Sequence, residues 1–254
     1  MQKALISSRN KYNIPPVGLT FDPTAPNGQT EIYQEFTFGT SLELDLHHHH
    51  LLHSDNEQEV LLGVYSTIYW SQYAFLPAEE RPGTIDEFLA LLPPAIAVIK
   101  PTVATTAMKN AITDLNHKHH ALALIEISKL LRSSLSTAST ILAFLDPENI
   151  GVFDDRLNTL LTSGEWNLFL GDEICGALAR PQTETLNDAT NRFALYCTVL
   201  GKIKQRVNQS RIGWKDPTGC QMLRFRSIDV QRALSSMISE HKRLNIQAKI
   251  RNVT

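Results

Sequence analysis

Two adjacent aspartates, Asp154 and Asp155, stand at the start of a predicted helix. A compact polar turn at residues 146–151 and the apolar pair Val152 and Phe153 come directly before them. A carboxylate held rigidly in this way can stabilise positive charge in a reaction or orient a water molecule. Aspartate is also a common helix cap, so capping is the alternative role of either residue.

The elements that must position these aspartates are predicted over residues 125–161. One helix over 125–132 ends in a polar turn that contains Ser133 and Ser134, and a second helix over 136–145 begins with small residues, Ser136 and Thr137. A tight turn that leads into a helix leaves backbone N–H groups unpaired, and such groups bind phosphate oxygens well. The third helix begins at the aspartates and runs to about residue 163.

The rest of the chain predicts a mostly α protein. Residues 1–53 are expected to be irregular, with short strands at 17–21 and 31–38, and residues 54–254 are expected to be helical. The patterns Ser54-x-x-Glu57 and Thr84-x-x-Glu87 predict capping boxes. Further helices are expected at the following positions: 54–73, from 84 onward, 101–116, 183–208 and 227–243.

Charge and composition narrow the classes of function. The 254 residues are 43% hydrophobic with a net charge of −2, yet residues 201–254 hold twelve Lys and Arg against three Asp and Glu. So basic a segment can neutralise phosphates. Three cysteines without C-x-x-C spacing argue against a disulfide framework or zinc knuckle and favour a reducing cytoplasm. The N-terminus lacks a signal-like apolar run, and the apolar stretch at 89–99 is too short for a membrane span.

Two other patterns in the sequence are candidate sites. The run of histidines at 47–50, with His53, has no nearby cysteine and no H-E-x-x-H spacing, so we expect no functional metal and no cofactor. Four aromatic residues between 65 and 73 are spaced as on one helix face, which is typical of a core. Within them, Tyr69 and Trp70 are weak candidates for stacking on an extruded base.

The window around the aspartates resembles the helix-hairpin-helix DNA glycosylase superfamily, in particular its bacterial branch similar to 8-oxoguanine DNA glycosylase. Residues 138–147 match the helix and loop of that family, and residues 153–157 match its apolar-Asp-x-(His/Arg)-apolar motif. The family's aspartate falls on Asp154, with Asp155 as the adjacent alternative. The stretch 224–230 resembles the Arg-x-x-Asp start of a C-terminal helix in the same branch.

Two departures from the family pattern affect the expected chemistry. The usual glycine pair of the hairpin is replaced by residues 133–136, which read Ser-Ser-Leu-Ser. Bifunctional members place a lysine near position 136 or 137, where this chain has Ser136 and Thr137, and Lys129 lies on the preceding helix. A Schiff-base lyase step needs an amine at the sugar. The resemblance therefore implies a monofunctional enzyme.

The resemblance implies a DNA glycosylase that flips a damaged or modified base out of double-stranded DNA and hydrolyses its glycosidic bond, leaving an abasic site. Some relatives act against modified phage DNA, so antiviral defence is part of this expectation. Neither a membrane nor an obligate protein partner is expected. The residues expected to contact DNA are Ser133, Ser134, Ser136, Thr137, Arg156, Arg224 and Arg226.

Two alternatives remain open from the sequence. A DNA-binding module could keep this fold without the chemistry, which the missing lysine and glycines permit. A metal-dependent nuclease or hydrolase could instead use the histidines with Asp154 and Asp155.

Overall fold

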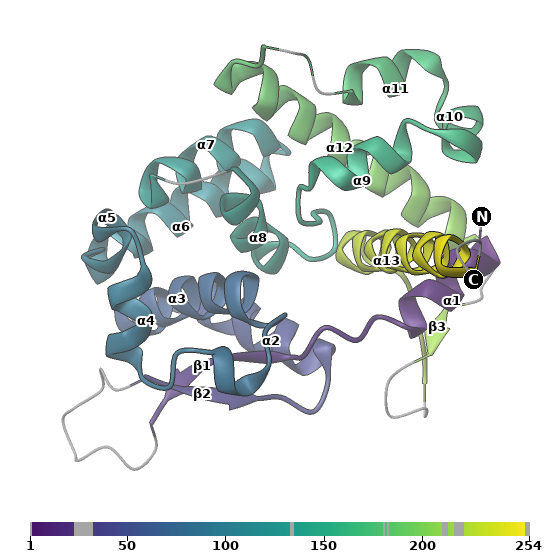
Figure 1. The fold of residues 1–254 in the computed structure, drawn as a ribbon. Coiled ribbons are helices and arrows are strands. Elements are labelled where there is room, and N and C mark those ends of the chain that lie inside the picture. The colour runs from purple at the N-terminus through teal and green to yellow at the C-terminus, as the bar shows by residue number, and fades with distance from the viewer. Residues whose placement is uncertain are drawn as a thin grey trace. The chain divides into compact units, whose positions relative to one another are not determined.

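The computed structural model describes residues 2–22, 33–132, 135–179, 181, 183–209, 213–215 and 221–251. Over these residues the chain forms thirteen α-helices, one short 3-10 helix and two small two-stranded sheets (Figure 1). The mostly α class expected from the sequence is therefore confirmed. In the described part of the chain, no helix is both long and apolar enough to cross a membrane.

The chain divides into two compact units. The first, which we call the hairpin unit, comprises Ile14–Pro147. The second, the aspartate unit, comprises Glu148–Thr254 together with Met1–Asn13. Each is described by itself below.

The hairpin unit is built around helix α3 (Glu57–Tyr73), in which every residue from Val60 to Trp70 is buried. A helix that is buried on all sides is a core helix. Around it pack α2 (Ser41–Leu52), α6 (Pro101–Asn116), α8 (Leu135–Leu145) and strand β1 (Val17–Phe21). Strand β2 (Tyr33–Thr37) pairs antiparallel with β1, with Val17 opposite Thr37. The remaining elements are the 3-10 helix Ala78–Glu80, α4 (Ile85–Leu91), α5 (Pro94–Ala97) and α7 (His120–Leu131).

The aspartate unit contains the two longest helices, α12 (Leu186–Asn208) and α13 (Ser227–Arg251), which pack on each other. The N-terminal helix α1 (Gln2–Asn10) lies along α13, so the two ends of the chain meet in this unit (Figure 1). Strand β3 (Trp214–Lys215) contacts α1 and pairs with β4 (Met222–Leu223). Three short helices, α9 (Asp155–Leu161), α10 (Gly164–Leu170) and α11 (Asp172–Leu178), connect to the start of α12.

Local signals in the sequence set several of these boundaries. Thr84 and Glu87 form the predicted capping box of α4, and α6 has the predicted bounds because Pro101 occupies its first turn. At α3 the cap is Asn56 rather than the predicted Ser54. The hydroxyl of Ser54 donates instead to the carboxylate of Glu59.

The description of residues 1–53 as irregular is wrong in two places. Both predicted strands are present, but α1 and α2 are helices. Helix α2 contains the histidine run and buries one face, but that face includes Asp45 and His48, while Leu46 is exposed, so no clean apolar stripe indicates the helix. Helix α1 is short and polar, and it is held by burial of Leu5 and Arg9 within the aspartate unit. In both cases tertiary packing outweighs the local pattern.

Candidate functional site

Asp154 is the N-cap of α9. Its carboxylate accepts a hydrogen bond from the backbone N–H of Arg156 at 2.8 Å. The Arg156 guanidinium also holds it, with Nε lying 3.1 and 3.0 Å from the two carboxylate oxygens. The two partners differ in solvent exposure: the Asp154 side chain is 22% exposed and that of Arg156 is 71% exposed. This hydrogen bond and ion pair raise the pKa of Arg156.

The loop before Asp154 is held in place by buried contacts. The Phe153 ring is buried against the edges of Phe193 and Tyr196, and the Tyr196 hydroxyl donates to the Val152 carbonyl at 3.0 Å. A Cβ on Gly151 would lie 2.7 Å from a methyl group of Leu200, so only glycine fits there. The loop thus places the Asp154 backbone against α12 with little freedom to shift.

Asp155 has a different kind of partner. Its carboxylate lies 2.7 Å from Nη1 of Arg192, a side chain that is only 5% exposed. Glu184 binds the same guanidinium at 2.7 Å, and that guanidinium lies over the Phe153 ring. Burial lowers the pKa of Arg192, but its hydrogen bonds to Glu184 and Asp155 outweigh this and raise it. Asp155 therefore helps to neutralise a buried cation and ties α9 to α12.

The two aspartates differ in how readily each carboxylate can be released. Freeing Asp155 would remove one partner from the buried Arg192, which is costly. Opening Asp154 to a ligand requires that the exposed Arg156 side chain swing into water while the helix cap stays in place, and exposed ion pairs contribute at most about 1 kcal/mol. Of the two, Asp154 is the carboxylate that a ligand can reach at low cost.

The predicted phosphate-binding hairpin lies in the hairpin unit, between α7 and α8. Ser133 and Ser134 lie outside the described residues. Arg132, just before them, is exposed and has a left-handed backbone with φ of 44°. Ser136 is exposed in the first turn of α8, where helix N–H groups lack intrahelical partners, and Thr137 is half-buried beside it. The sequence analysis did not single out Arg132.

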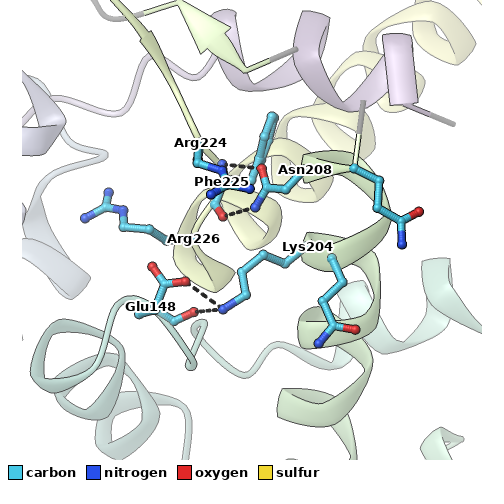
Figure 2. Close-up of a pocket in the computed structure, with 8 residues that line it drawn as sticks. Glu148, Lys204, Asn208, Arg224, Phe225 and Arg226 are labelled. Carbon is cyan, nitrogen blue, oxygen red and sulfur yellow. Dashed lines mark hydrogen bonds and ion pairs between the residues drawn. The ribbon is translucent and has the colours of Figure 1, made fainter. Parts of the chain in front are cut away.

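Arg224 and Arg226 are brought together in one pocket of the aspartate unit, with a volume of about 580 Å³ (Figure 2). Arg224 is exposed. Arg226 forms an ion pair with the buried carboxylate of Asp229, with Nε 2.9 Å from Oδ2. The sequence analysis missed the other lining residues, which come from the loop and from the end of α12: Glu148, Lys204, Gln205, Asn208 and Gln209.

Tyr69 and Trp70, the weak candidates for base stacking, lie in the core of the hairpin unit. Tyr69 is 1% exposed, and its hydroxyl donates to the Glu35 carboxylate. Trp70 is 6% exposed and packs against the ring of Phe144. Because both rings are buried, neither residue is available to stack on an extruded base.

The histidine run belongs to α2, where successive side chains point about 100° apart. Each described partner is different: His47 donates to the Leu19 carbonyl, His48 pairs with the Ser66 hydroxyl, and His49 donates to the Phe144 carbonyl. Among the described residues, no group of three or more His, Cys, Asp or Glu side chains could hold a metal ion. The run therefore has a packing role in this structure.

Comparison with known protein families, characterised proteins and solved structures found no match to this chain.

Proposed function

We propose that this protein is a monofunctional DNA N-glycosylase in which Asp154 is the catalytic carboxylate. The observation that carries the proposal is the setting of Asp154: a carboxylate on a rigid loop at a helix N-terminus, with an exposed and displaceable arginine as its only side-chain partner in the described part of the chain. The resemblance of residues 125–161 to the helix-hairpin-helix glycosylases supports the same assignment.

In the proposed reaction, the target nucleotide is flipped out of the duplex so that its sugar reaches Asp154. As the C1′–N bond breaks, positive charge develops on the sugar, and the fixed carboxylate stabilises it. The oxygen of a water molecule bonds to C1′, one water proton passes to the departing base, and the other stays on the new hydroxyl group. Arg156, once displaced from Asp154, is available to a DNA phosphate.

The hairpin between α7 and α8 is proposed to bind the DNA backbone through the first turn of α8, which includes Ser136 and Thr137. No lysine stands at these two positions, and Lys129 is on α7. A lyase step through a Schiff base is therefore not part of the proposal. The substrate is a damaged or modified base in double-stranded DNA.

A change of Asp154 to Asn tests the proposal cleanly, because asparagine caps a helix as well as aspartate does but carries no charge. DNA duplexes with oxidised, alkylated, deaminated and phage-type modified bases are incubated with the protein and then treated with alkali. We expect alkali-dependent breaks with the wild type and at least a hundredfold slower formation with Asp154→Asn.

The matched control is Asp155→Asn, which makes the same chemical change at the neighbouring position and is expected to retain most of the cleavage. Loss of cleavage only in Asp155→Asn, with the urea unfolding midpoint of that variant unchanged, would transfer the role to that residue. Breaks without alkali that a chelator abolishes would favour a metal-dependent nuclease instead. Duplex binding without breaks on any substrate would favour the inactive DNA-binding module.

A further inference from the structure

The pocket of the aspartate unit in Figure 2 is made by three separate pieces of chain. Glu148 comes from the loop that leads to Asp154, the last two turns of α12 give Lys204 and Asn208, and the segment before α13 gives Arg224 and Arg226. A pocket of about 580 Å³ falls within the size range of small-ligand sites.

The lining is predominantly cationic. Lys204, Arg224 and Arg226 face a single carboxylate, Glu148. Lys204 is fixed in place, because its Nζ donates to both the backbone carbonyl and the carboxylate of Glu148 at 2.8 Å. The Glu148 side chain is 60% exposed while that of Lys204 is 14% exposed, so the carboxylate can move into solvent and leave the ammonium in the pocket.

The segment that carries the two arginines is also fixed. The Asn208 side chain donates to the Phe225 carbonyl at 2.8 Å and accepts from the Phe225 N–H at 2.9 Å. This pair of hydrogen bonds, seen in Figure 2, holds residue 225 so that Arg224 and Arg226 stay at the pocket. Fixing the backbone of this segment in advance lowers the ordering cost of binding an anion.

Next to the pocket, a buried carboxylate holds one of the pocket's arginines. Asp229 is fully buried, and it lies beside the guanidinium groups of Arg9, Arg226 and Arg232. Asp229 thus holds the Arg226 guanidinium, and the pocket lining itself carries three cations against one carboxylate. The pocket therefore favours an anion with several acceptor oxygens, which is the character of a phosphate group.

We propose that this pocket is a phosphate-binding site and that in the enzyme–DNA complex it takes a backbone phosphate of the substrate. The inference rests on the proposed function. Asp154 follows Glu148 by six residues, so their Cα atoms are at most about 21 Å apart. The bound phosphate is therefore expected on the same duplex, near the flipped nucleotide.

Arg224 is the residue of choice for the test, because it is exposed and its side chain makes no hydrogen bond or ion pair with another described residue. Binding of a fluorescent duplex is measured by anisotropy over a range of salt concentrations. For Arg224→Gln we expect about tenfold weaker binding and a fall of about 1 in the slope of log affinity against log salt. Lys204→Gln is expected to act in the same direction.

Arg206→Gln is the matched control, since Arg206 is an exposed cation of the same helix as Lys204 but does not line the pocket. A second arm replaces single phosphates near the target by neutral methylphosphonates. At one position the loss should equal that of Arg224→Gln, and combining the two changes should add no further loss. Equal binding by Arg224→Gln, Lys204→Gln and Arg206→Gln would overturn the inference.

A third arm titrates inorganic phosphate into the protein by calorimetry and so separates this inference from the proposed function. If the wild type binds no duplex, the glycosylase proposal fails. In that case, phosphate binding that Arg224→Gln abolishes keeps the pocket as a site for free phosphate, and the absence of such binding overturns it. If the duplex binds and only Arg224→Gln is without effect, the pocket inference alone fails.

Discussion

At the scale of the residue, the charged side chains of the aspartate unit divide by the exposure of their partners. Asp154 is paired with an exposed arginine, whereas Asp155 and Asp229 hold arginines that are almost fully buried. Removing one member of a buried pair leaves an uncompensated charge in a medium of low polarity. The exposed pair is available for function, and the buried pairs contribute to stability.

The prediction at this scale concerns Asp229. Burial alone would raise its pKa, but Arg226, Arg9 and Arg232 outweigh that effect and lower it, so the group is an anion in the folded protein. We expect Asp229→Asn to reduce the free energy of unfolding by about 3–5 kcal/mol, because buried arginines lose their common partner. Urea denaturation measures this.

Asp188→Asn, in the exposed capping box of α12, is the control for that measurement and should change the free energy of unfolding far less than Asp229→Asn does. A loss for Asp229→Asn as small as that of the control would show that the buried cluster does not stabilise the unit.

At the scale of the element, the turn between α7 and α8 is where this chain departs most from the helix-hairpin-helix pattern. Residues 133–136 lack the glycine pair of the glycosylases that this window resembles, yet Arg132 adopts the left-handed conformation that glycine adopts most readily. A side chain in this conformation costs roughly 1 kcal/mol. The chain therefore keeps a cation at the turn at some cost in backbone energy.

Two substitutions of Arg132 separate its backbone from its charge. Glycine removes both the charge and the strain, whereas alanine removes only the charge. We expect Arg132→Gly to be about 1 kcal/mol more stable than Arg132→Ala in thermal or urea unfolding. If the hairpin binds DNA phosphates, both variants should weaken duplex binding equally. Equal stability of the two would contradict the left-handed conformation at this residue.

At the scale of the whole molecule, ionisable groups are distributed unevenly along the chain. The basic surplus lies in residues 201–254, whereas eight of the nine histidines lie between residues 47 and 120, within the hairpin unit. Burial lowers the pKa of His47, His53 and His120 below the ordinary value of 6.5. The stability of the protein should therefore depend on pH near neutrality.

The sign of this dependence follows from proton uptake. Below about pH 6.5 the unfolded chain binds more protons at these histidines than the folded protein does. The free energy of unfolding is therefore highest above that pH and decreases as the pH falls. We expect the urea midpoint to decrease from pH 7.5 to pH 5.5. The decrease should be smaller in His47→Gln, whose amide can still donate to the Leu19 carbonyl. A midpoint that stays constant or rises in acid would contradict this.

Local chemistry let the sequence determine much of the helical framework. Pro101 and the Thr84–Glu87 capping box act within one turn of a helix, so α6 and the start of α4 could be predicted from neighbouring residues alone. The same holds for the turn at 146–151, the helix that begins at Asp155, and strand β1. Asp154 and Asp155 could be predicted as candidate site residues because they directly follow this local turn in the sequence.

Only the tertiary structure decided which of these residues face which partners. The ion pair between Arg9 and Asp229 joins residues 220 positions apart, and it explains why α1 belongs with α13. The difference between Asp154 and Asp155 depends on Arg192, and the phosphate pocket depends on Lys204 meeting Glu148. Such contacts arise from packing between distant segments, and no periodicity, cap or spacing along the chain encodes them.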